Sequence, residues 1–87
     1  MPNIRENDSE VLIPHEVVVL CAVKGLSPIA AWRVYKGVSQ NELANKIGVT
    51  LPVLTLLEQQ GTKPTVDELE KVANSLGIQR AQLELVD

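Results

Sequence analysis

The side chains that most often carry out catalysis or bind metals are sparse in this sequence. A metal site needs several ligands close together, yet the one histidine, His15, and the one cysteine, Cys21, would occupy different faces of a helix. A catalytic site needs a nucleophile beside a base, or paired carboxylates in a pocket, and the carboxylates here are scattered along the chain. We therefore expect no enzyme activity, no metal site and no cofactor.

A second group of polar side chains is suited to contacting a nucleic-acid backbone. Gln40 follows Ser39 where a helix should begin, and the free N–H groups and dipole of a helix N-terminus attract phosphate. Asn41, Thr50 and Lys63 could contact phosphates beside it. The alternative for Gln40 is that it is simply a polar residue in a first helical turn.

Two predicted helices joined by a short turn would position these side chains. Ser39 and Glu42 form a capping-box pattern, which predicts a helix from the residue after the serine. Gly48 suits the left-handed residue that ends a helix, and Thr50 suits the cap of a second helix. The stretch 39–60 thus predicts a helix-turn-helix motif, in which the second helix enters the major groove of DNA.

Caps, prolines and glycines predict four further helices, at about 14–24, 28–36, 65–76 and 80–85. The first of these contains Val17, Val18 and Val19, which would also suit a strand, but Pro14 and Gly25 bracket the segment as a helix. Its continuous apolar character predicts burial under the other helices or in a dimer interface.

The predicted fold is all-α, a single small helical domain of about five to six helices that spans residues 13–87. Residues 1–12 are mostly polar and lack periodicity, so we expect a flexible N-terminal arm. Apolar residues make up 45% of the 87 residues, enough for one small core. That core must be mainly aliphatic, because Trp32 and Tyr35 are the only aromatic residues.

Charge and cysteine content narrow the class of protein further. The net charge of −3 counts against a strongly basic nucleic-acid binder, although a local positive face would still allow DNA binding. A single cysteine excludes a disulfide framework. The sequence shows neither a signal peptide nor an apolar stretch long enough to span a membrane, so we expect a cytoplasmic protein with no membrane partner.

The pattern Gly-x-Ser-Gln-x-x-Leu-Ala-x-x-x-Gly-Val-Thr, which runs on to Leu57-Glu58, resembles the phage-repressor and Cro class of helix-turn-helix proteins, the Xre family. IPHEVV at 13–18 and AWRVYKG at 31–37 look like the bacterial antitoxins of that family. The resemblance covers about residues 13–83 and implies a phage-repressor-like fold and a double-stranded DNA operator. An antitoxin would also bind a small toxin, and a basic toxin would suit the acidic residues at 67, 68, 70 and 84.

An ion pair is expected inside the motif. At about 100° per residue, Leu51, Leu54, Leu57 and Glu58 fall on the side of the second helix that should face the core. A buried carboxylate needs a partner, and Arg33 is the natural one. The family resemblance also implies a buried arginine–glutamate pair at these positions. The alternative is that Glu58 reaches solvent from the end of its helix.

The positions expected to read bases differ from the family pattern. The resemblance aligns Leu51, Pro52 and Leu56 with positions where relatives usually carry Gln, Arg, Ser or Asn, which hydrogen-bond to bases. All three are apolar here, and only Thr55 and Gln59 keep polar reach. These five residues and the four phosphate candidates form the predicted DNA-binding set.

Two functions from different classes fit these observations. The favoured one is a sequence-specific DNA-binding transcriptional regulator, a repressor that forms a homodimer because such motifs normally read two half-sites, and an autorepressing antitoxin. The alternative is a protein-interaction module on a helix-turn-helix scaffold that has weakened or lost DNA reading. In that case the apolar residues 51–53 and Leu56 would form the binding patch.

Overall fold

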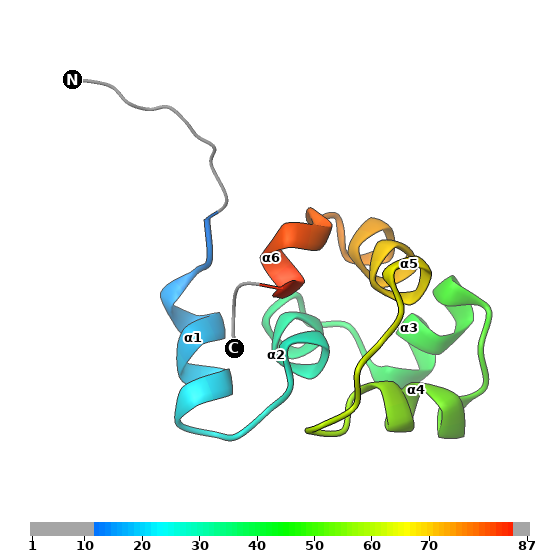
Figure 1. Cartoon of the computed structure of the whole chain (residues 1–87), viewed down its shortest axis with the longest axis horizontal. Helices are drawn as coiled ribbons and strands as arrows, with labels where there is room; N and C mark the ends of the chain where they lie inside the picture. Colours follow the sequence, from blue (N-terminus) through cyan, green and yellow to red (C-terminus); the bar gives the residue numbers. More distant parts are fainter. Residues whose placement is uncertain (1–11, 85–87) are drawn as a thin grey trace.

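The computed structural model describes residues 12–84, and within that range it is all-α, as predicted. The six helices are α1 (His15–Ala22), α2 (Pro28–Tyr35), α3 (Gln40–Ile47), α4 (Leu51–Leu57), α5 (Val66–Leu76) and α6 (Arg80–Glu84) (Figure 1). The strand alternative for residues 17–19 is wrong, since they lie in α1. The predicted arm lies outside the described residues except for Leu12, as does residue 85 at the predicted end of the last helix.

The caps predicted from the sequence begin the helices. In α3, the Ser39 hydroxyl accepts from the Glu42 backbone N–H at 3.0 Å, and the Ser39 N–H donates to the Glu42 carboxylate at 2.8 Å. Thr65 and Glu68 repeat this capping box at α5. The hydrogen bonds with the Ser39 backbone and hydroxyl lower the pKa of Glu42, and the negative charge of this carboxylate interacts favourably with the positive end of the α3 dipole.

Helix α2 lies in the middle of the molecule, with α1 on one side and α3 and α4 on the other (Figure 1). Trp32 is its central residue and is almost fully buried. The Trp32 indole Nε1–H donates to the Gln82 carbonyl at 3.0 Å, which ties α2 to α6, and the ring meets Tyr35 edge to face at 5.7 Å. The remaining core is aliphatic, as expected from the composition.

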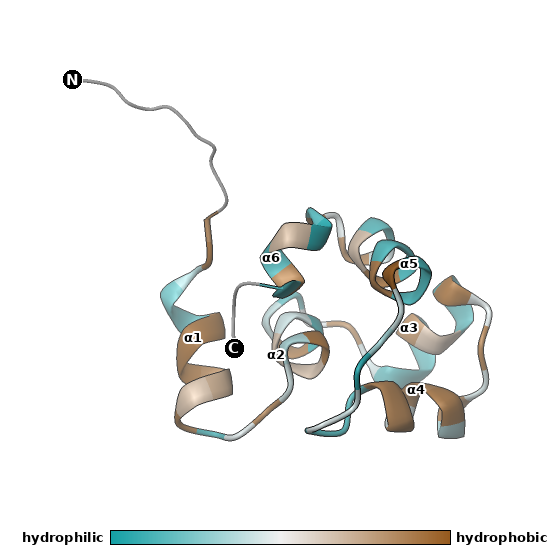
Figure 2. Cartoon of the chain, viewed as in Figure 1, coloured by the Kyte–Doolittle hydropathy of each residue, from teal (hydrophilic) through white to brown (hydrophobic). Residues whose placement is uncertain are grey.

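Helix α1 is only partly covered by the rest of the chain. Val17 is fully buried, but it is the only α1 residue that is. Val18 is 43% exposed, and Val23, just past the helix, is 74% exposed. Figure 2 shows the apolar ribbon of α1 at the edge of the domain. The other helices therefore do not cover the outer side of this segment, so that alternative is wrong for this side. Burial of the outer side in a dimer interface stays a prediction.

Leu51 does not lie in the core, contrary to the prediction. It is 40% exposed, whereas Leu54 and Leu57 are buried. The direction midway between those two leucines points to the core, and at about 100° per residue Leu51 lies roughly 90° away from it. The first turn of α4 therefore presents its leucine at the border of the outer surface.

Gly48 sets the angle between α3 and α4 through its backbone. Its φ of +74° is left-handed, and a Cβ built there would meet no atom within 4 Å. Replacement by alanine should therefore cost only the backbone strain, about 1–2 kcal/mol of unfolding free energy. Urea denaturation of Gly48→Ala should show this loss and Gly48→Asn a smaller one, because Asn tolerates this conformation better. An alanine variant as stable as the parent would contradict the assignment.

Candidate nucleic-acid interface

Helices α3 and α4 and the turn between them form the predicted helix-turn-helix. After Gly48, the Val49 N–H donates to the Ala44 carbonyl at 3.0 Å, which closes the end of α3. The Thr50 hydroxyl then accepts from the Val53 N–H at 3.4 Å and caps α4. The two helices lie next to each other at the end of the domain away from α1 (Figure 1).

The structure places Arg33 of α2 and Glu58 at the end of α4 in a bidentate ion pair. The Arg33 Nε lies 2.6 Å from Glu58 Oε2, and Nη2 lies 3.3 Å from Oε1. The third nitrogen, Nη1, donates to the Val38 carbonyl at 3.0 Å. The two side chains are only 15% and 7% exposed, so this glutamate does not reach solvent from its helix end. The pair fixes the end of α4 against α2 and the α2–α3 connection.

Gln40 joins the same network from the first turn of α3. Its Nε2 donates to Glu58 Oε1 at 2.9 Å. The amide nitrogen carries two N–H donors, so one donor and the amide oxygen remain for another contact such as a phosphate. Sequence reasoning missed this bond. It could have been expected, because a buried carboxylate can accept more hydrogen bonds than one bidentate arginine donates and so needs a further donor nearby.

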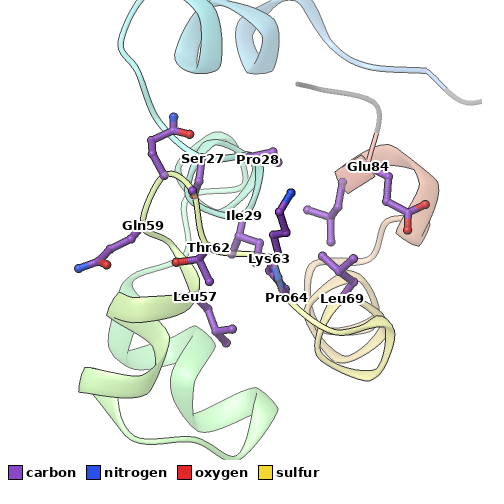
Figure 3. Close-up of a pocket in the computed structure, with 13 residues that line it drawn as sticks. Ser27, Pro28, Ile29, Leu57, Gln59, Thr62, Lys63, Pro64, Leu69 and Glu84 are labelled. Carbon is purple, nitrogen blue, oxygen red and sulfur yellow. The ribbon is translucent and has the colours of Figure 1, made fainter.

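The other phosphate candidates are not all brought together. Asn41 and Thr50 are exposed at the start of α3 and α4. Figure 3 shows the Lys63 side chain directed into a pocket of about 510 Å³ between α2 and α6, whereas Gln59 points away from it. Lys63 is exposed too, but its side chain extends away from the outer side of α4, so Asn41 and Thr50 are the exposed candidates at the starts of α3 and α4.

The outer surface of α4 is mainly apolar. Leu56 is 57% exposed, and Leu51, Pro52 and Val53 are exposed as well, as the brown ribbon of α4 in Figure 2 reflects. The Thr55 hydroxyl donates to the Leu51 carbonyl at 3.0 Å, so its hydrogen is not available to a base. Of the predicted base-reading set, only Gln59 keeps side-chain donors that no described residue accepts.

The charge of the motif is close to balanced. Between residues 39 and 61 the ionisable side chains are Glu42, Lys46 and Glu58. Arg33 neutralises Glu58, which leaves the negative charge of Glu42 and the positive charge of Lys46, so the motif has no surplus positive charge. Attraction to phosphate must then come largely from helix N-termini, amide groups and Lys46.

Within residues 12–84, no group of three His, Cys, Asp or Glu residues could hold a metal ion. No helix in this described part is long and apolar enough to cross a membrane. His15 is exposed and Cys21 is partly buried, both on α1 and distant in sequence from the motif.

Comparison with known proteins agrees with this geometry. Residues 29–83 match the family model described as Helix-turn-helix, which covers more than half of the chain, so the chain belongs to that family. A similar solved structure is that of a hypothetical transcription factor, NHTF, from Neisseria. The two are 26% identical, the match covers 87% of this chain and 90% of that one, and the TM-score is 0.60. Comparison with curated proteins returned no significant match.

Removal of the Glu58 carboxylate should destabilise the domain strongly. Glu58→Ala leaves Arg33 partly buried without a counter-charge and removes the acceptor of Gln40, at a cost of about 3–5 kcal/mol. Thermal or urea unfolding measures this loss. A matched control is Glu70→Ala, which breaks the exposed pair with Arg80 and should cost less than about 1 kcal/mol.

The double variant Arg33→Met with Glu58→Leu should recover much of the stability, since it leaves no unpaired charge. Recovery should be incomplete, because Val38 and Gln40 also lose a partner. If Glu58→Ala and Glu70→Ala unfold alike, the pair does not stabilise the domain in the way described.

Proposed function

We propose that this protein is a sequence-specific DNA-binding transcriptional regulator that acts as a repressor. The observation that carries the proposal is the α3–α4 helix-turn-helix, held by the network of Arg33, Glu58 and Gln40. Membership of the helix-turn-helix family and the similarity to a hypothetical transcription factor support it.

The proposed mode of binding follows from the positions of the two helices. The N-terminus of α3 approaches a phosphate, which the second N–H of Gln40 and the backbone N–H groups of the first turn contact. Asn41 and Thr50 contact neighbouring phosphates, and α4 enters the major groove. Lys63 is exposed and contacts phosphate once its side chain turns from the pocket towards α4. Occupation of an operator beside the promoter then represses transcription.

A titration with DNA from upstream of the protein's own gene tests this function. Affinity should fall as salt rises, with a modest slope because few cations are available for phosphate contact. Gln40→Ala should weaken binding several-fold at either salt concentration, and Gln79→Ala, an exposed glutamine between α5 and α6, should not. The unfolding free energy of each variant separates loss of contact from loss of fold. Absence of salt-dependent binding both to this DNA and to a pool of random-sequence duplexes would overturn the function, because DNA-binding proteins also bind non-operator DNA through phosphate contacts.

We also propose a homodimer formed through α1. The outer side of this helix exposes Val18, and Val23 follows directly after it, while Leu20 and Cys21 are only partly buried. An eight-residue helix is too short to be stable on its own in water, so it benefits from a second covering surface. A second copy of the same helix supplies it, and the resulting two-fold symmetry matches two half-sites.

Light scattering at micromolar concentration should give about twice the chain mass of 9.5 kDa. Val18→Lys should shift the protein towards the monomer, since it places a charge in the apolar contact. Val66→Lys is the matched control, because Val66 is exposed on α5, far along the chain from α1. A monomer at every concentration, or equal behaviour of the two variants, would contradict an α1 dimer.

We further propose that the repressor is an antitoxin. This role is supported by the resemblance of residues 13–18 and 31–37 to the bacterial antitoxins of the Xre family. These residues contribute to α1 and α2. The acidic residues considered for a basic toxin are mostly engaged within the chain: Glu68 belongs to a capping box, and Glu70 and Glu84 both pair with Arg80. Co-purification with the product of a short basic neighbouring gene tests the role. Its failure would leave the DNA-binding function standing.

A further inference from the structure

The outer side of α4 can be defined from its buried residues. Leu54 and Leu57 point into the core, so the opposite arc holds Pro52, Thr55 and Leu56, with Gln59 just beyond the helix end. All four are exposed. This arc is the part of α4 that faces a ligand in the major groove if α4 acts as the recognition helix.

This arc offers almost no hydrogen-bond donors. Pro52 and Leu56 have no polar side-chain atom, and the Thr55 hydroxyl hydrogen is donated to the Leu51 carbonyl at 3.0 Å. The threonine therefore presents its methyl group and an acceptor oxygen. Only Gln59 can make the paired donor–acceptor contact that distinguishes adenine, and it lies past the last residue of the helix.

Base pairs differ in the major groove by hydrogen-bonding groups and by the C5-methyl group of thymine, which apolar side chains contact. We propose that α4 reads thymine methyl groups, with Leu56 as the main specificity-determining residue, Pro52 and the Thr55 methyl beside it, and Gln59 as the one hydrogen-bonding reader. The operator half-sites are then rich in thymine at the positions that face α4. This inference rests on the proposed DNA-binding function.

The charge of the motif is compatible with a DNA ligand. DNA can bind only if the motif does not strongly repel phosphate. The motif contains two carboxylates, and Arg33 neutralises one of them, Glu58. The other, Glu42, keeps its charge at the start of α3, and the positive charge of Lys46 in the last turn of the same helix offsets it. The exposed arc of α4 itself carries no charge, so it can enter the groove without an unpaired charge to desolvate.

The experiment first locates the bound region of the upstream DNA by footprinting and then replaces thymines in it by uracil. This change removes only the methyl group, so each contacted position should weaken binding by about threefold to fivefold. The salt dependence should not change, because no phosphate contact is lost. Uracil at thymines outside the footprint is the control and should have no effect.

Protein variants identify the side chain that reads the methyl. Leu56→Ala should weaken binding to normal DNA and lose most of the discrimination between thymine and uracil at one position, which a double-mutant cycle measures. Leu56→Gln should shift the preference towards adenine at that position. Val66→Ala, a truncation of an exposed apolar residue on α5, should change neither property.

The outcomes keep the two claims apart. If the protein binds DNA in a salt-dependent way, but uracil and normal operators bind alike and Leu56→Ala has no effect, the methyl readout is overturned and the DNA-binding function stands. If Leu56→Ala leaves the affinity for DNA unchanged and instead disrupts a complex with another protein, the outer side of α4 binds that protein and the inference is again overturned. If no DNA binds, the function itself fails and the readout fails with it.

Discussion

Three helices of this domain meet at one carboxylate. Glu58, at the end of α4, accepts from Arg33 of α2 and from Gln40 of α3, and Arg33 also holds the Val38 carbonyl between those two helices. A charge pair that is almost excluded from water is tolerated only when both partners are present, so each helix is fixed relative to the others. The orientation of the helix-turn-helix thus depends on a polar contact, in a domain whose aliphatic core is small.

This network also links stability to the proposed function. Gln40 supports Glu58 with one N–H and keeps the other for a phosphate, so the same amide that completes the ion pair can position DNA. The carboxylate orients the amide in advance, which reduces the entropy lost on binding. Helix α1 packs against the domain through Val17, its single fully buried residue. Its exposed apolar side is consistent with a second copy as its cover.

Much of the fold could be predicted from the sequence because the signals are local. Ser39, Gly48 and Thr65 each specify a helix end through their own backbone or side-chain chemistry, and the structure confirms those ends. Features that depend on the direction of a side chain were harder to predict. Leu51 turned out half-exposed because the core direction is set by Leu54 and Leu57, and the bond from the Thr55 hydroxyl to its own helix backbone gives no sequence signal. The direction of Lys63 depends on how a loop packs against α2 and α6, which spacing alone does not encode.

The central claim is that α3 and α4 together form the surface that contacts DNA. The most direct measurement is a ¹H–¹⁵N NMR titration of the full chain with DNA from upstream of its gene. We predict chemical-shift changes at the backbone amides of Gln40, Asn41 and Thr50 and along the outer arc of α4, together with the side-chain amide of Gln40, while the amides of α5 stay unchanged. Changes confined to α1 or α5, with α4 unaffected at saturation, would contradict the account.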